Sequence, residues 1–296
     1  MEIWFEEHPI MVYVAVMILL TIIVTVGDIF YDFFYKKKRD WKDTGANILI
    51  SIGKEIIWKT FIWTIGLVIL YIVSNFIPWE IGMNIVTWIM SFILADVTYY
   101  WMHRIEHEHS ILWALHWVHH SSESYNMSTA NRLSWFEDLI EWIFLIPMVL
   151  MWFNVFQIII SLIFVVIYQH FLHTDKIKKL WFFEKIFNTP SHHRVHHWSN
   201  KKYINKNYSW VLIIWDKIFW TFQEEKEEVI YGLIKNIATY NPLWINTIEF
   251  KNIFNRVTKC QTTRDKIKMI FWPTWWEPMY FKKNKNEKNK RTTRSN

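Results

Sequence analysis

Histidines with the spacing of metal ligands gather in the middle of this 296-residue chain. Twelve of its thirteen histidines lie between residues 103 and 197. Residues three or four apart lie on one face of a helix, so a group at this spacing can direct two or three imidazoles at one point. Eight histidines form three such groups, with the patterns HxxxH, HxxHH and HxxHH: His103 and His107; His116, His119 and His120; His193, His196 and His197.

The residue types indicate which chemistry these groups would perform. Neutral imidazole binds iron, copper, nickel and zinc, and eight imidazoles are too many for one ion but suit two. A structural zinc site would be closed by four ligands, often including cysteine, whereas Cys260 is the single cysteine of the chain. Hydrolytic metal pairs usually include bridging carboxylates. These nearly pure histidine groups therefore favour a di-iron centre that uses dioxygen.

Two further residues extend the candidate site. His173 follows the last apolar run and is a candidate ninth ligand. Asp96 stands on one helical stripe with Tyr100, His103 and His107, at steps of four, three and four residues. We therefore expect its carboxylate to accept an imidazole N–H and fix the tautomer of that ring. For this reason Asp96 counts among the candidate catalytic residues.

The composition is typical of a membrane protein. Hydrophobic residues make up 52% of the chain, aromatic residues 19%, and there are 21 tryptophans. Trp and Tyr gather where the apolar bilayer core meets the headgroups. The formal net charge of +6 is concentrated in residues 36–39 and 282–294. Because these basic runs flank apolar segments, they favour anchoring at an anionic lipid surface, with no nucleic-acid partner.

The apolar stretches predict an all-α fold, a multi-pass transmembrane helical bundle. A single helix over the last stretch would measure about 51 Å, far more than the core thickness of about 30 Å. We expect instead a hairpin that turns near residues 152–154 and returns His193 to the side of His116, which the basic run at 36–39 places in the cytosol. The four stretches are 9–30, 56–77, 84–102 and 139–172. The histidine-rich, cytosolic di-metal cap comprises 103–138 and 173–223.

These patterns divide the chain into three parts. Residues 1–240 form the membrane-embedded part with its histidine cap. Residues 241–281 begin with an amphipathic segment, PLWINTIEFKNIFNRV, which we expect to lie on the membrane interface. Residues 282–296 are a basic tail with few apolar residues, a composition typical of disorder.

The three histidine groups, in this order and between apolar hairpins, resemble the fatty acid hydroxylase and sterol desaturase superfamily of membrane di-iron oxygenases. The stretches HHSSESYN, TPSHHRVHH and VLIIWD are similar to its alkylglycerol monooxygenase branch, which includes bacterial relatives. This likeness covers residues 90–235 approximately. It implies that residues 1–240 are a hydroxylase domain and that the eight histidines of the three groups bind two Fe ions.

The resemblance also implies a reaction and a reductant. With O2 and a tetrahydropterin such as tetrahydrobiopterin, the enzyme would hydroxylate the carbon next to the ether oxygen of a lipid substrate, an alkylglycerol. The product would collapse to a fatty aldehyde and a glycerol derivative. In the family, a glutamate after the second histidine is tied to pterin dependence, and Glu108 holds that position here. A solvated acidic surface formed with Glu106 explains Glu108 equally well.

The chain departs from the family pattern close to the histidines. Gly-Arg-Asn after the last histidine pair is replaced at residues 198–200, and Asn205 replaces an aspartate. Ser209 and Trp210 replace two glycines. This bulkier and less flexible floor can change the substrate or the reductant, whereas the expected metal ligands are retained.

Two rival functions stay open. Within the superfamily, the chain could be a sterol, carotenoid or fatty-acyl hydroxylase or desaturase that takes electrons from an external electron donor. From another class, it could be a non-catalytic membrane metal-binding protein. A transporter would place ionisable residues along a path inside the spans, whereas these histidines gather beyond the span ends. We expect a multi-pass protein of the plasma membrane in a bacterium, or of the endoplasmic reticulum in a eukaryote.

Overall fold

A computed structural model describes residues 9–55, 60–200 and 202–281. Throughout these residues the fold is helical, with isolated β-bridges at Phe187–Leu212 and Trp198–Tyr231 and no strand. The all-α class expected from the sequence is confirmed for this part of the chain. The helices are α2 (Pro9–Phe34), α3 (Trp41–Gly53), α4 (Thr60–Ser74), α5 (Ile85–Glu108), α6 (Ser110–His120), η2 (Met127–Asn131), α7 (Asp138–Leu150), α8 (Val155–His170), η3 (Trp181–Lys185), α9 (Pro190–His196), α10 (Ile214–Ile218), α11 (Pro242–Val257) and α12 (Thr263–Phe271).

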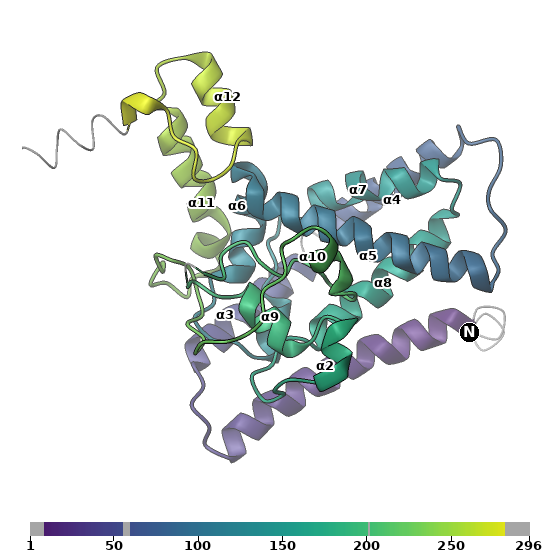
Figure 1. The fold of residues 1–296 in the computed structure, drawn as a ribbon, viewed down its shortest axis with the longest axis horizontal. Coiled ribbons are helices and arrows are strands. Elements are labelled where there is room, and N and C mark those ends of the chain that lie inside the picture. The colour runs from purple at the N-terminus through teal and green to yellow at the C-terminus, as the bar shows by residue number, and fades with distance from the viewer. Residues whose placement is uncertain (1–8, 56–59, 201, 282–296) are drawn as a thin grey trace, which may run out of the picture.

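Four helices form an apolar bundle at one end of the molecule (Figure 1). α4 packs on α7, and α5 packs on both α7 and α8. Leu70, Ala95, Leu145 and Leu162 belong to the shared core, one from each helix. α5 then continues out of this bundle, so that it carries core residues at one end and histidines at the other. This single rigid helix connects the apolar bundle to the cap.

The apolar run 139–172 is two helices rather than one. The chain reverses between α7 and α8, and Trp152 adopts a left-handed φ of 68° in the turn. The side chain of Asn154 accepts the backbone N–H of Phe156 at 2.8 Å and so caps the start of α8. This reversal returns the chain to the end of the molecule where His173 follows α8.

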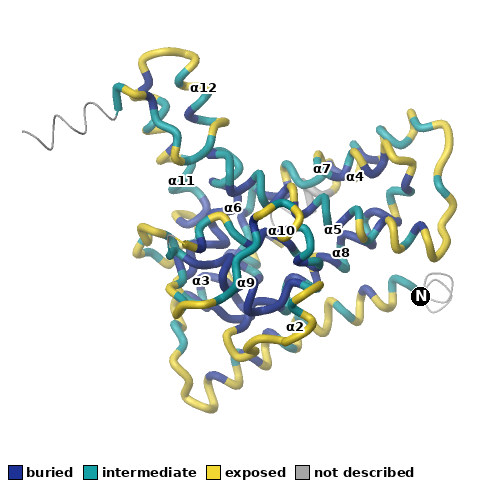
Figure 2. Tube along the Cα trace, in the orientation of Figure 1, coloured by how far each residue is buried: buried dark blue, intermediate teal, exposed yellow. Residues whose placement is uncertain are grey.

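Among the described residues, two helices are long and apolar enough to cross a membrane, Ile10–Phe34 and Ile85–Glu108. In the first, only 11% of the most apolar window is buried, and Figure 2 shows α2 mostly exposed or half-buried along its length. Exposed apolar surface of this extent marks contact with a membrane or another protein. The second helix is longer than the expected span 84–102. The start of the expected span 56–77 lies outside the described residues.

Part of the basic run at 36–39 is buried. The Arg39 guanidinium binds Asp28 at 2.9 Å and Asp32 at 2.7 Å, and its side chain is 1% exposed. It also donates to Asn126 Oδ1 at 2.7 Å. Arg39 therefore ties the α2–α3 turn to the polar loop before η2, while the three lysines that precede it are exposed.

α11 and α12 form a helical pair that packs on α6 and protrudes beside the cap (Figure 1). Asn241 caps α11 by accepting two backbone N–H groups of its first turn. Large apolar side chains stay exposed on this pair, Trp244 and Phe271 among them. The segment expected at the membrane interface, 241–281, therefore has unburied apolar surface. The tail at 282–296 lies outside the described residues.

Candidate metal centre

Nine histidines converge in the cap as two groups, and all nine are buried. Within each group the ligand nitrogens all lie within 4.8 Å of one another. All residues of α9 are buried, and Figure 2 shows buried chain in this region of the molecule. The five-histidine group consists of His103, His107, His116, His120 and His196, and the four-histidine group consists of His119, His173, His193 and His197.

Three helices supply most of these side chains. α5 carries HxxxH in its last turns, and α6 folds back so that its HxxHH faces them. α9 starts at Pro190, whose fixed φ suits the first position of a helix. It carries His193 and His196 of the last HxxHH, and His197 follows directly after it. His119 and His120 are neighbours in sequence but belong to different groups, and so do His196 and His197. Each short helix therefore serves both groups.

The Nε2 atoms within each group face one another at short distances. If two nitrogens each lie about 2.1 Å from one metal ion and the nitrogen–metal–nitrogen angle is a right angle, the nitrogens are about 3.0 Å apart. The observed spacing therefore fits a metal ion in each group. Five pairs of Nε2 atoms are 3.0 to 3.1 Å apart: His103–His116, His120–His196, His119–His173, His173–His193 and His193–His197.

Backbone carbonyls fix the tautomer of four rings, because each ring donates its Nδ1 N–H to a carbonyl oxygen. A neutral imidazole has one N–H, so the Nε2 of these rings carries a lone pair. His119 and His173 thus direct two lone pairs at each other, an arrangement that a bound cation stabilises. His107 Nε2 is also buried without a hydrogen-bond partner. The four bonds, at 2.8 to 3.3 Å, are His103–Tyr208, His119–Arg132, His173–Gln169 and His196–Lys206.

Burial favours the neutral form of four grouped imidazoles, those of His119, His120, His173 and His196. It lowers the pKa of His173 to about 3 and the pKa of His196 to about 3. For His119 and His120, burial and then the neighbouring histidines hold the pKa well below its ordinary value of 6.5. Neutral imidazole is the form that binds a metal. These rings are therefore in their ligand form at neutral pH.

A buried charged cluster adjoins the five-histidine group. His116 Nδ1 lies 3.4 Å from Glu106 and 3.5 Å from Glu137. The Lys54 ammonium lies 3.3 Å from Glu137 and 2.8 Å from Asp138. Burial alone would raise the pKa of Glu137, but Lys54 and His116 bring it below its ordinary value. Glu137 is therefore an anion beside the histidines.

The two glutamates at the end of α5 have different surroundings. Glu106 is 1% exposed and faces His116, so the expected acidic surface is wrong for this residue. Glu108 has a side chain that is 39% exposed and pairs with Arg104 at 2.9 Å. Glu108 belongs to neither histidine group. Its role toward a pterin stays a prediction.

Asp96 positions a loop rather than an imidazole. Its buried carboxylate accepts the two backbone N–H groups of residues 211–212 and the indole N–H of Trp215, at 2.8 to 3.0 Å. The expected bond from an imidazole to Asp96 is therefore wrong, because these donors occupy the carboxylate. The loop that Asp96 holds carries Trp210, whose Nε1 lies 3.1 Å from His103 Nδ1. Trp210 thus contacts the five-histidine group directly.

The segment that carries the histidine groups is similar to a known protein family. Residues 88–221 match the fatty acid hydroxylase family, and this segment contains all nine grouped histidines. This part of the chain belongs to that family. The resemblance seen in the histidine motifs is confirmed, and together with two apolar helices it indicates a membrane protein.

Longer relatives extend the match beyond the hydroxylase domain. Alkylglycerol monooxygenase from Homo sapiens is 42% identical over 216 residues, and that from Danio rerio is 41% identical over 214 residues. Each match covers 71% of this chain and 47% of the relative, so the chain spans about half the length of these curated relatives. Ornithine lipid hydroxylase OlsE from Rhizobium tropici is 26% identical over 189 residues, which is 60% of this chain and 53% of that protein. No solved structure matches the chain.

The hydroxylase domain contains two supporting residues that the sequence reasoning missed. Asp216 accepts the backbone N–H of Tyr208 at 2.8 Å, and the Tyr208 carbonyl accepts the N–H of His103. The Arg132 guanidinium is fully buried against an α3 carboxylate at 3.0 Å, and its carbonyl accepts the N–H of His119. The sequence offers one signal, because each of these charged residues follows an uncharged stretch. Asp216 ends VLIIWD, and Arg132 ends NMSTANR.

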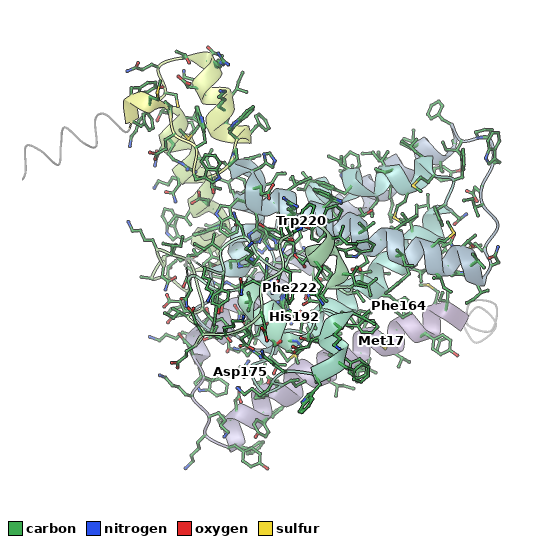
Figure 3. All side chains as sticks on the ribbon, viewed as in Figure 1. Met17, Phe164, Asp175, His192, Trp220 and Phe222 are labelled. Carbon is green, nitrogen blue, oxygen red and sulfur yellow. The ribbon has the colours of Figure 1, made fainter. Side chains whose placement is uncertain are left out.

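Two other histidines of the hydroxylase domain adjoin the groups without joining them. His170 Nε2 lies 2.9 Å from the Thr25 hydroxyl, which connects α8 to α2. The His192 ring packs edge-on against Phe222, with ring centroids 5.4 Å apart, and both are labelled in Figure 3. Both residues therefore have packing partners away from the nine convergent nitrogens.

Proposed function

We propose that this chain is a membrane di-iron oxygenase that hydroxylates a lipid. The observation that carries the proposal is the convergence of nine buried imidazoles in a fatty acid hydroxylase domain, with the lone pairs of His119 and His173 directed at each other. Imidazole donors suit iron, and the two groups would hold two ions, with the nine histidines as ligands. When bound, the iron pair supplies the activation of dioxygen.

The chain's own residues orient the ligands and exclude water. Backbone carbonyls of Tyr208, Arg132, Gln169 and Lys206 each hold one Nδ1 N–H, which keeps the Nε2 atoms of those rings directed inward. All nine histidines are buried, so bulk water is kept from the reacting groups. Asp96 keeps Trp210 beside His103, and the indole therefore forms part of the wall around the five-histidine group.

The sharper form of the proposal is cleavage of an ether lipid. One oxygen atom of O2 would enter the C–H bond next to the ether oxygen, and the other would leave as water. A tetrahydropterin such as tetrahydrobiopterin would supply two electrons and two protons and become a dihydropterin. The resulting hemiacetal would release the glycerol hydroxyl and leave a fatty aldehyde. Four alkylglycerol monooxygenases with 34% to 42% identity support this substrate class.

A second candidate is lipid hydroxylation without ether cleavage. The similarity to an ornithine lipid hydroxylase favours it, and so does the bulky Trp210 in contact with the five-histidine group. An external electron donor would then replace the pterin. The same metal centre would serve a sterol, carotenoid or fatty-acyl hydroxylase or desaturase, and these rivals differ in their substrate. A non-catalytic metal-binding protein would have the same metal centre and no substrate.

The membrane setting completes the proposal. Residues 1–240 would be the membrane-embedded hydroxylase domain, with its cap on the cytosolic side, and residues 241–281 would lie on the interface. The exposed apolar side chains of α2 and of the α11–α12 pair support this arrangement. The membrane would be the plasma membrane in a bacterium or the endoplasmic reticulum in a eukaryote.

The deciding experiment is aldehyde release from a 1-O-alkylglycerol by iron-loaded protein in detergent, with O2 and tetrahydrobiopterin. We expect pterin-dependent aldehyde that is absent in the His119→Ala variant. Glu108→Ala should reduce pterin-driven turnover while the iron content stays at two, and a control variant, Glu80→Gln, should behave as wild type. No aldehyde from protein that carries two irons would exclude ether cleavage and leave the second candidate.

A further inference from the structure

A pair of buried carboxylates stands beside the five-histidine group with incomplete compensation. Glu106 is 1% exposed, and neither of its side-chain oxygens has a hydrogen-bond partner. His116 lies 3.4 Å from Glu106, and Glu137, which is 8% exposed, is its carboxylate neighbour. An ionised carboxylate buried without partners is costly, and burial together with Glu137 raises the pKa of Glu106 well above its ordinary value. A positive charge nearby would stabilise the ionised carboxylate.

Lys54 supplies only one positive charge to this cluster. Its ammonium binds Glu137 at 3.3 Å and Asp138 at 2.8 Å, so one cation faces two carboxylates before Glu106 is counted. Three carboxyl groups therefore share one lysine in this cluster. The ammonium also occupies the place beside Glu137, which disfavours a separate metal ion among the carboxylates.

The carboxyl groups complement the neighbouring histidines. Imidazole ligands bring no negative charge, whereas two divalent ions would bring four positive charges into the cap. His116 links the two regions, because its Nδ1 faces Glu106 and Glu137 while its Nε2 lies 3.0 Å from His103. A carboxylate on the outer N–H of a ligating histidine fixes the ring and raises its basicity.

The two histidine groups differ in this respect. Among the described residues, the carboxylates within ligand distance of a grouped histidine face the five-histidine group alone. Both groups have aromatic neighbours; beside the four-histidine group, the Tyr125 ring lies 5.2 Å from His197 and 5.6 Å from His173. Tyr125 is itself stacked on Tyr231 at 4.9 Å. The two positions therefore have different electrostatic surroundings.

We infer that Glu106 and Glu137 are positioning residues that hold His116 and balance the charge of a metal ion at the five-histidine group, so that the two metal positions are unequal in affinity. The inference rests on the proposed metal centre. It assigns these carboxylates a role that neither their burial nor their packing explains.

Cobalt(II) titration of the metal-free, full-length protein in detergent tests the inference, with absorption spectra that resolve the two ions. Glu106→Gln and Glu137→Gln should each weaken one of the two binding events by about 10- to 100-fold and leave the other unchanged. The weakened event should be the one lost in His107→Ala and kept in His197→Ala. Glu249→Gln serves as the matched control, because this carboxylate pairs with Arg256 at 3.2 Å in α11.

The unfolding temperature of the metal-free protein separates this role from a merely structural one. Glu106→Gln keeps the shape of a buried side chain whose oxygens have no hydrogen-bond partner, so metal-free protein should unfold at about the wild-type temperature while it binds the metal more weakly. A structural carboxylate would change both quantities in the same, unfavourable direction. Glu137→Gln breaks the pair with Lys54, so Glu106→Gln is the decisive variant.

Each result has a distinct meaning. Two cobalt ions bound by both variants as tightly as by wild type would overturn the inference and leave the proposed function standing. Equal weakening at both positions would overturn the inequality. A wild-type protein that binds no pair of ions would instead remove the metal centre on which the proposed function depends.

Discussion

His119 and His173 face each other with their Nε2 atoms 3.1 Å apart, although each ring already donates its Nδ1 N–H to a backbone carbonyl. Neither ring therefore has a second proton to place between them. Two adjoining lone pairs in a buried site repel each other, so the arrangement is favourable when a cation lies between them. His173 follows α8 and lies outside the three spaced groups of the sequence. Its Nε2 is nevertheless as close to His119 as the Nε2 atoms of the spaced groups are to one another.

His173→Ala should lower the iron content of the purified protein from two ions to one. The four-histidine group would keep three imidazoles and lose the ring that lies 3.1 Å from both His119 and His193. Iron analysis per chain is the measurement. His170→Ala is the matched control, since this neighbour binds the Thr25 hydroxyl and should leave the iron content at two. Two irons in both variants would show that His173 is no ligand.

The stability of the metal-free protein should fall as the pH decreases below 6.5. The pKa of His173 and that of His196 are lowered to about 3 in the folded chain, whereas in the unfolded chain they are near 6.5. Between these values the unfolded state binds more protons, so acid favours unfolding, by up to about 1.4 kcal/mol per pH unit for each such histidine. Chemical denaturation from pH 7.5 to pH 5 measures the slope. His196→Ala should make it shallower, and a flat profile would contradict the neutral, buried histidines.

Asp96→Asn should destabilise the protein by about 1–3 kcal/mol, because an amide cannot accept from all three donors now bound to the carboxylate. The backbone at residues 211–212 would lose a partner, and Trp210 would move relative to His103. Thermal unfolding in detergent and iron content are the measurements. Glu80→Gln, on an exposed carboxylate, is the control. Unchanged stability with lost iron would argue for a direct metal role instead.

Cysteine labelling should place the loops of the cap on one face of the membrane. In a Cys260→Ser background, single cysteines at Glu123 and Lys202 should react with an impermeant maleimide from the same side. A cysteine at Met83, in the α4–α5 connection, should react from the other side. All three positions are exposed. Labelling of Glu123→Cys and Lys202→Cys from opposite faces would exclude a shared cap.

Local periodicity accounts for much of what the sequence could predict. Histidines three or four residues apart share a helical face whatever the tertiary fold, so eight of the nine convergent side chains were expected to act together. The length of the run 139–172 also required a reversal, because one helix of that length exceeds a bilayer. Both inferences depend only on local helix geometry, which residues a few turns apart in the sequence determine.

The remaining features depend on contacts between distant segments. His119 and His120 are adjacent, and their separation into different groups is decided by which rings of α9 meet each of them. Glu106 and Glu108 look equivalent in sequence, yet one faces His116 and the other faces solvent. Asp96 lies on the histidine stripe as expected, but its carboxylate accepts hydrogen bonds from the backbone at residues 211–212 rather than from an imidazole. No spacing rule reports such long-range partners.

The division of α9 between both histidine groups has a consequence for biosynthesis. This short helix gives His196 to one group and His193, with His197 just after it, to the other. Before α9 docks, the chain therefore supplies four of the five imidazoles of one group and two of the four imidazoles of the other. Docking of this seven-residue helix, together with the residue after it, completes both groups in a single event.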